Sequence, residues 1–224
     1  MARRRLSASA VTYSIVALER ETGRLGVAAA TGLQAVGALV PHLRGGVGAV
    51  ATQGRATNPL YGPDALAALA RGETPEAALG ALAAADPGRG HRQAIVIDAA
   101  GRTAGWTGAE NVPEMAHRLA EGVAVAGNML AEAAGLDAML EAVAVTAGPL
   151  EERLLAALRV AEAAGGDRRG TCSAALKVEG ARGYPDTDLR IDHDPAPVAA
   201  LARLLERHRG DEVQGFLAGL PVRG

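Results

Sequence analysis

Paired β-rich segments alternate with paired helical segments along this sequence. The β-rich runs 12–19 and 25–31 are joined by a short polar turn ending in a glycine, which is typical of a β-hairpin. Residues 92–98 and 103–107 repeat this pattern across a second glycine-containing turn. Hairpins that alternate with helix pairs favour antiparallel sheets covered by helices over a parallel βαβ sheet, so we predict a layered α+β domain.

The remaining elements are predicted from apolar periodicity and from turn and cap residues. Further strands are expected at 45–52, 122–126, 173–178 and 188–192, and helices at 64–71, 75–85, 131–146, 149–164 and 195–208. The clearest helix start is Thr74 followed by Pro75, because threonine is a good N-cap and proline suits the first helical position.

Composition excludes several classes of function. Hydrophobic residues make up 49% of the 224 residues, which is incompatible with a disordered chain. The net charge of −2 gives no electrostatic reason to expect a nucleic-acid partner. Apolar runs end well short of the ~18 residues that a membrane span needs, so no membrane partner is expected. Aromatic residues are only 2%, so the core must consist of Ala, Val, Leu and Ile.

The cellular context and assembly follow from similar observations. The single cysteine, Cys172, cannot form an internal disulfide, and the arginine-containing segment 1–10 lacks the apolar stretch of a secretory signal. We therefore expect a cytoplasmic protein. Several helices have Ala and Leu on more than one face, which predicts a homo-oligomer that buries them.

Two motifs resemble cofactor or metal sites, but each has a simpler interpretation. Gly46 and Gly48 fit part of a dinucleotide fingerprint, yet they lie inside a β-rich run and do not open a helix. Residues 192–194, Asp-His-Asp, could hold a divalent ion, but a charged strand end that caps the last helix before Pro195 is the simpler explanation. We predict neither a cofactor nor a metal.

Two loops contain groups that suit ligand binding. The segment 163–170 has paired glycines followed by Asp167, Arg168 and Arg169, a combination that could orient a polar ligand or simply end a helix with solvated charges. Asn128 follows a predicted strand, where its side chain could stabilise an oxyanion or form a turn. The local sequence leaves both alternatives open.

Together these segments resemble domain-of-unknown-function family 1028, a family of the N-terminal-nucleophile hydrolase superfamily. The resemblance extends from about residue 12 to 207. It rests on segments 12–17, 49–53, 57–63, 92–93, 107–108, 127–130, 164–170, 173–176 and 188–193.

The resemblance implies a four-layer αββα sandwich of antiparallel sheets flanked by helices, and hydrolysis of an amide by an N-terminal residue. Thr12 would be the nucleophile with its own α-amine as general base, and Asn128 or nearby backbone amides would stabilise the oxyanion. Asp167 would tune the amine and orient the substrate, a small amide or peptide-like metabolite.

The resemblance also implies that Thr52, Gln53, Arg92 and Arg169 bind the substrate. A second hypothesis keeps the same sandwich without catalysis, as a module that binds a small anionic metabolite through the same loops. The state of the chain before Thr12 discriminates between the two, because a nitrogen in a peptide bond cannot act as a base.

The expected domain organisation follows from this mechanism. Residues 1–11 are expected to be an unstructured extension, 12–208 a single domain and 209–224 a C-terminal tail. Relatives typically begin with Met-Thr, and Val11 stands where their initiator methionine would be. We expect translation to begin at position 11 with removal of that methionine, and autocatalytic cleavage of a propeptide is the alternative.

Overall fold

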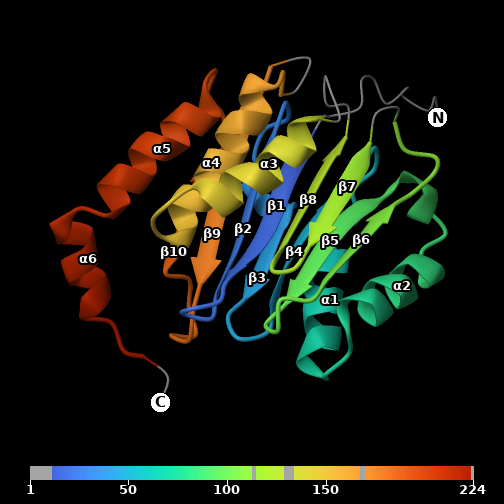
Figure 1. Ribbon diagram of the computed structural model, residues 1–224, viewed down its shortest axis with the longest axis horizontal. Coiled ribbons are helices and arrows are strands. Elements are labelled where there is room, and N and C mark those ends of the chain that lie inside the picture. Colours follow the sequence, from blue (N-terminus) through green and yellow to red (C-terminus); the bar gives the residue numbers. More distant parts are fainter. Residues whose placement is uncertain (1–11, 113–114, 129–133, 167–169, 223–224) are drawn as a thin grey trace, which may run out of the picture.

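The computed structural model describes residues 12–112, 115–128, 134–166 and 170–222 (Figure 1). In this part of the chain, two antiparallel sheets pack face to face. The first sheet has the strand order β10-β9-β2-β1-β8-β7. Its strands are β1 (Thr12–Glu19), β2 (Arg24–Thr31), β7 (Ala116–Ala120), β8 (Val123–Asn128), β9 (Ser173–Glu179) and β10 (Thr187–Ile191).

The second sheet has the order β3-β4-β5-β6. Its strands are β3 (Pro41–Arg44), β4 (Gly48–Gln53), β5 (Gln93–Asp98) and β6 (Thr103–Thr107). The described helices are α1 (Tyr61–Ala70), α2 (Pro75–Ala85), α3 (Ala134–Val145), α4 (Leu150–Ala163), α5 (Pro197–His208) and α6 (Asp211–Ala218), with 3₁₀ turns at Val36–Ala38 and Arg89–His91. The prediction of an α+β protein with antiparallel sheets is confirmed.

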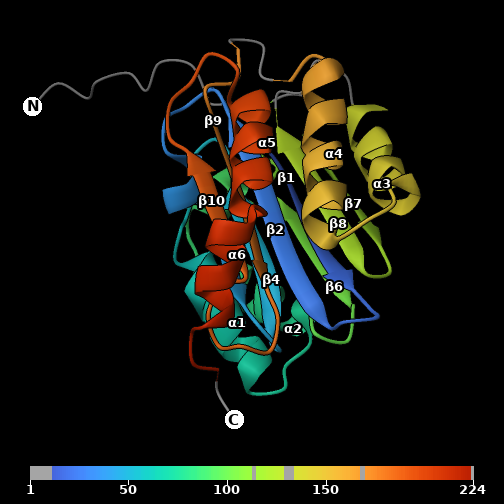
Figure 2. The ribbon, with the colours of Figure 1, turned by 90° about the vertical axis from the view of Figure 1, so that its left-hand side faces the viewer.

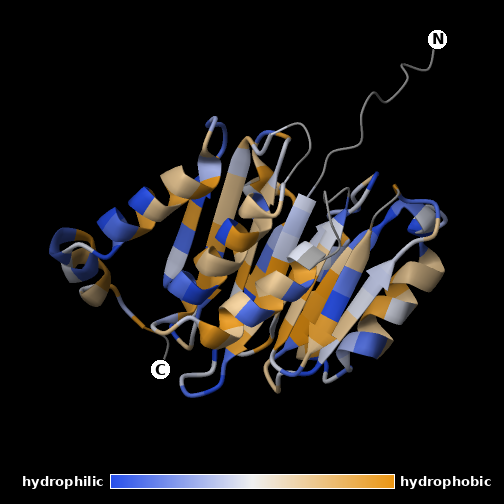
Figure 3. Ribbon diagram, turned by 45° about the horizontal axis from the view of Figure 1, so that its top comes forward, coloured by the Kyte–Doolittle hydropathy of each residue, from blue (hydrophilic) through white to orange (hydrophobic). Residues whose placement is uncertain are grey.

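The helices cover the two outer faces of the paired sheets. Helices α3, α4 and α5 pack against the first sheet, and α1 and α2 pack against the second (Figures 1 and 2). Three apolar clusters fill the spaces between these layers: one under α3–α5, one between the sheets and one under α1 and α2. Figure 3 shows the hydrophobic residues concentrated on the central strands, with hydrophilic ones on turns and outer helix surfaces.

Strand β1 lies at the centre of this arrangement and is buried along its whole length. Successive side chains of a strand point to opposite faces, so Tyr13 and Ile15 pack under the helices while Val16 and Leu18 pack between the sheets. The same alternation directs the side chain of Thr12 toward the second sheet. The first residue of β1 is therefore a polar group at one end of the space between the sheets.

Helix starts with a local signal were predicted well. Thr74 caps α2, because its Oγ1 accepts a hydrogen bond from the Ala77 amide at 3.2 Å. The run 45–52 is instead a turn at Gly46, which has φ of +70°, followed by β4. The prediction missed the edge strands β3 and β7, and helix α6 lies within the residues assigned to the C-terminal tail. Among the described helices, none is long and apolar enough to cross a membrane.

Candidate active site

The candidate site lies at the end of the inter-sheet space where β1 begins. In the first sheet, Thr12 pairs with Thr31 on one side and with Asn128 on the other. In the second sheet, Gln53 pairs with Gln93. Thr31, Asn128, Gln53 and Gln93 are each at most 3% exposed, so these residues form a buried polar cluster beside Thr12.

Thr12 makes contacts through its backbone and its side chain. Its nitrogen donates to Asn128 Oδ1 at 3.0 Å, and its Oγ1 donates to Thr31 Oγ1 at 3.1 Å. The Thr12 carbonyl oxygen accepts from Gln53 Nε2 at 3.1 Å. These contacts fix the nitrogen and the hydroxyl of one residue, which is itself only 6% exposed.

Gln93 connects the two sheets within this cluster. Its Oε1 accepts from Gln53 Nε2 at 2.8 Å and from Asn128 Nδ2 at 3.4 Å. Its Nε2 lies near three acceptors: Thr107 Oγ1 at 3.1 Å, the Ala116 carbonyl at 3.0 Å and the Gly127 carbonyl at 3.2 Å. Buried polar groups are normally satisfied in this way, and here a single amide on β5 joins two strands of the first sheet, β7 and β8, to the second sheet.

The cluster ends at a half-buried histidine on the edge strand β7. Thr107 Oγ1 and His117 Nδ1 are 2.9 Å apart. Burial, and to a lesser extent the Arg118 cation, lowers the pKa of His117. Gly105 allows the ring to lie across β6, since a Cβ there would come within 2.4 Å of His117 Cδ2.

Two predicted substrate-binding residues belong to a neighbouring cluster on the other face of the second sheet. Arg92 donates to Asp86 Oδ2 at 2.9 Å and to the Ala56 carbonyl at 2.6 Å, and these bonds brace the loop after β4. Thr52 Oγ1 donates to the Asn58 carbonyl in the same loop at 3.0 Å. The hydrogen bond from Arg92 holds the pKa of the Asp86 carboxyl well below its usual range.

The geometry therefore brings together part of the predicted set. Thr12, Asn128 and Gln53 lie in one cluster, whereas Thr52 and Arg92 brace a loop beside it. Asp167 and Arg169 lie outside the described residues.

The residues that follow the glycine loop lie near the start of β1. Thr171 Oγ1 is 3.2 Å from the Tyr13 hydroxyl, and the Cys172 amide donates to the Thr31 carbonyl at 2.8 Å. Tyr13 and Thr31 are adjacent to Thr12 along the strand and across the sheet. The chain that leaves the glycine loop therefore passes beside the first residues of β1.

Two residues of the cluster were not among the predicted site residues. Gln93 and Thr31 are single neutral residues at strand ends, and neither has a motif around it that indicates chemistry. The only available signal was the inward-facing position of Gln93 at the start of a strand, next to Arg92. Their grouping depends on the register between strands that are distant in sequence.

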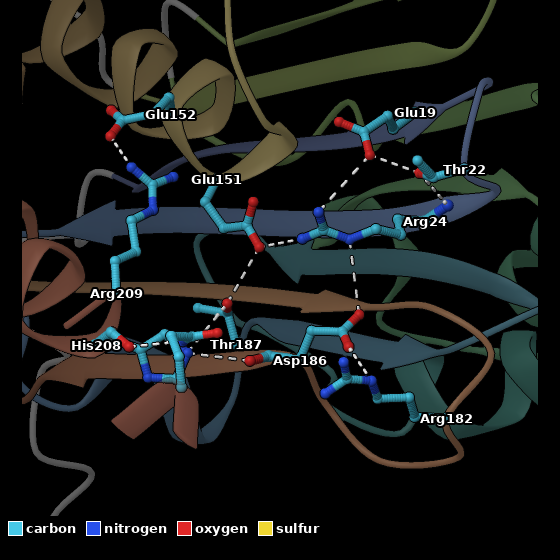
Figure 4. Close-up of polar contacts among 11 residues, drawn as sticks. Glu19, Thr22, Arg24, Glu151, Glu152, Arg182, Asp186, Thr187, His208 and Arg209 are labelled. Atoms are coloured by element: carbon cyan, nitrogen blue, oxygen red, sulfur yellow. Dashed lines mark hydrogen bonds and ion pairs between the residues drawn. The ribbon is translucent and has the colours of Figure 1, made fainter. Parts of the chain in front are cut away.

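A second polar cluster lies at the opposite end of the β1–β2 hairpin, about 23 Å along the strand (Figure 4). Arg24 lies among three carboxylates there: it forms an ion pair with Glu151 and lies 3.7 Å from Glu19 and 3.6 Å from Asp186. Thr187 Oγ1 also donates to Glu151 at 3.2 Å. Arg24, Glu151, Asp186 and Thr187 border a cavity of about 500 Å³ between the hairpin, α4, β10, α5 and α6.

Two antiparallel sheets face each other, helices cover both outer faces, and a buried polar cluster lies at one end of the space between the sheets. The molecule is therefore a mixed α+β protein. The chain belongs to the family of unknown function DUF1028, whose sequence model matches residues 12–201. The predicted family is thereby confirmed.

Solved structures agree with this family membership. The crystal structure of protein SPO2555 from Silicibacter pomeroyi, also described under DUF1028, is 36% identical, with a TM-score of 0.90 over 95% of this chain and 92% of that chain. Anbu (ancestral beta-subunit) from Yersinia bercovieri is 12% identical, with a TM-score of 0.41 over 95% of this chain and 99% of that one, a similarity too low to support an argument. No curated protein matches the chain.

Proposed function

We propose that the protein is an N-terminal-nucleophile amidohydrolase that cleaves a small amide or peptide-like metabolite, with Thr12 as its nucleophile. The observation that carries this proposal is the position of Thr12, with its nitrogen 3.0 Å from Asn128 Oδ1 and its hydroxyl toward the second sheet. The family match also begins at residue 12. The helix-covered pair of antiparallel sheets supports assigning the fold to the αββα sandwich of that superfamily.

The proposed general base is the α-amine of Thr12. Among the described residues, the side chains that contact Thr12 are neutral amides and a hydroxyl, and none of these is a base near neutral pH. A free α-amine has a pKa of roughly 7.7–8.0, so it can accept the hydroxyl proton near neutral pH. This chemistry requires a mature chain that starts at Thr12.

The reaction then proceeds in two balanced steps. Thr12 Oγ1 attacks the amide carbonyl carbon, the α-amine accepts the hydroxyl proton and passes it to the leaving nitrogen, and an ester forms on Thr12. Water, deprotonated by the same amine, hydrolyses the ester, releases the acid and restores Thr12. Asn128 Oδ1 accepts an N–H bond from the amine and so orients its lone pair toward the hydroxyl.

The orientation of Asn128 changes the role expected from the sequence. Its Nδ2 is turned toward Gln93, so we assign oxyanion stabilisation to backbone amides rather than to this side chain. Asp167 keeps its proposed catalytic role of tuning the amine and orienting the substrate, and Arg169 keeps its proposed role in binding the substrate. Arg92 is assigned to bracing the loop after β4.

The alternative is a binding module with the same site and no catalysis. The specific observation that favours it is the neutrality of the contacts of Thr12, because without a free amine this cluster has no base. In that case the buried amides and the loops beside them would hold a small metabolite.

Intact mass and an activity screen test the proposal together. Protein expressed from its native gene is expected to begin at Thr12 and to hydrolyse a member of a panel of amides, N-acyl amino acids and ureides. Thr12→Ala should abolish turnover with an unchanged unfolding curve, and Thr12→Ser should keep part of it. Thr22→Ala, at the other end of the same hairpin, is the control and should be fully active. Full activity of Thr12→Ala would overturn the proposal.

A further inference from the structure

The direction of the Gln93 amide is fixed by its surroundings. Two of the three acceptors near Nε2 are backbone carbonyls, those of Ala116 and Gly127, and a carbonyl oxygen can only accept. Turning the amide over would place Oε1 against both of them. The nitrogen must therefore face these carbonyls, and Oε1 must face Gln53 and Asn128.

The side-chain amides of Asn128 and Gln53 contact both Gln93 Oε1 and Thr12. Because Gln93 Oε1 is an acceptor, Asn128 presents Nδ2 to it and keeps Oδ1 for the Thr12 nitrogen. Gln53 likewise presents Nε2, which donates both to Gln93 and to the Thr12 carbonyl, while its own Oε1 has no hydrogen-bond partner in the described part of the chain. Gln53 is held in this direction by the Thr12 carbonyl as well, since that oxygen can only accept, whereas the partner of Asn128 Nδ2 is Gln93.

We propose that Gln93 is a positioning residue that sets which atom Asn128 offers to Thr12. Without its oxygen, Asn128 would lose the partner of Nδ2, and its amide could turn a donor toward the Thr12 nitrogen. An acceptor at that point orients the lone pair of a free α-amine toward its own hydroxyl, whereas a donor would compete for that lone pair. The catalytic consequence rests on the proposed function, but the ordering of Asn128 does not.

The first experiment measures the ordering alone. Solvent exchange of the Asn128 side-chain amide protons, followed by NMR in the full chain, should be slow in the wild type because the group is buried and bonded to Gln93. Gln93→Met keeps the shape without the polar atoms and should speed this exchange at least tenfold. Gln214→Met, which replaces an exposed glutamine on α6, is the control and should leave it unchanged. Equal protection in wild type and Gln93→Met would overturn the proposal.

The second experiment measures the consequence for turnover. Gln93→Met should lower kcat about 10²-fold with KM within a few-fold of wild type, since a misoriented group costs about this much. Gln93→Glu can mimic glutamine only when protonated, so its activity should rise as the pH is lowered, beyond the change seen in wild type. A kcat for Gln93→Met equal to wild type would overturn the positioning role. Absence of turnover in every variant, wild type included, would count against the proposed function and leave the exchange result to decide the ordering.

Discussion

The two ends of the β1–β2 hairpin are both polar, but they are built from different chemistry. At the start of β1, Thr12 is surrounded by neutral amides and a hydroxyl whose contacts depend on which atom faces which. At the other end, Arg24 is surrounded by the carboxylates of Glu19, Glu151 and Asp186 (Figure 4). The Arg24 guanidinium can pair with any of these carboxylates, so this cluster does not depend on which single atom faces which.

The two ends of the hairpin contribute differently to the protein. An ion-pair cluster joins the hairpin to α4 and β10, and its loss leaves uncompensated charge, so its main effect is on folding. A network of oriented amides makes little difference to net charge, but it places one acceptor at one nitrogen, so its main effect is on the chemistry of that nitrogen. We therefore expect variants at the Arg24 end to lower stability, and variants in the amide cluster around Thr12 to lower activity.

The largest expected effect on stability comes from removing the cation of the charged end. Arg24→Met leaves three carboxylates together without their shared cation. Breaking a fully buried pair costs about 3–5 kcal/mol, and because Arg24 is 22% exposed we expect a loss of about 2–3 kcal/mol. Urea denaturation measures the free energy of unfolding. Arg118→Met, which breaks the exposed pair with Asp137, is the control and should cost at most about 1 kcal/mol.

Equal losses in the free energy of unfolding for Arg24→Met and Arg118→Met would contradict a stabilising role for the charged end. Folded Arg24→Met should also keep the turnover of wild type per folded molecule, because its site lies about 23 Å from Thr12 along the strand. A variant that was stable but inactive would place the charged end in the catalytic machinery.

A smaller loss of stability is expected from adding a methyl group beneath the His117 ring. Gly105→Ala puts a Cβ within 2.4 Å of the imidazole ring, and such overpacking costs about 1–3 kcal/mol. Because His117 contacts Thr107 in the amide cluster, this variant should also reduce turnover. Gly80→Ala in α2 is the matched control: its Cβ would meet nothing within 4 Å, so it should stabilise by about 0.5–1 kcal/mol.

Sequence reasoning predicted best what local patterns determine. The buried run of β1 and the Thr74 cap of α2 are specified by neighbouring residues, and both are observed. The edge strands β3 and β7 were missed, because Pro41–Arg44 and Ala116–Ala120 have little apolar alternation and are specified by their pairing with β4 and β8.

The candidate site was predictable only in part for a related reason. Thr12, Gln53 and Asn128 lie in segments with a family resemblance, and they do lie together. Arg92 and Gln93 lie together in another such segment, and the charged residue was chosen, but Asp86 and the Ala56 carbonyl hold Arg92 in a loop. The role of neutral Gln93 arises from carbonyls on two other strands, which its own segment does not reveal.

The smallest expected effect is on the pH dependence of stability. Burial lowers the pKa of both His117 and His42, so the unfolded chain binds protons that the folded chain does not. Stability should therefore rise with pH between the lowered values and about 6.5, and level off above that. Urea denaturation at several pH values checks this. His117→Gln should flatten the slope, and an unchanged slope in His117→Gln and His42→Gln would contradict the assignment.

Trapping the reaction intermediate shows whether Thr12 is the nucleophile. An activated ester or β-lactone incubated with protein from its native gene should acylate the nucleophile, and peptide mapping by mass spectrometry locates the label. We expect a chain that begins at Thr12 with the acyl group as an ester on that residue, and no label in Thr12→Ala. An active protein that retains residues 1–11, or a label on a different residue, would contradict the assignment of Thr12 as a nucleophile assisted by its own α-amine.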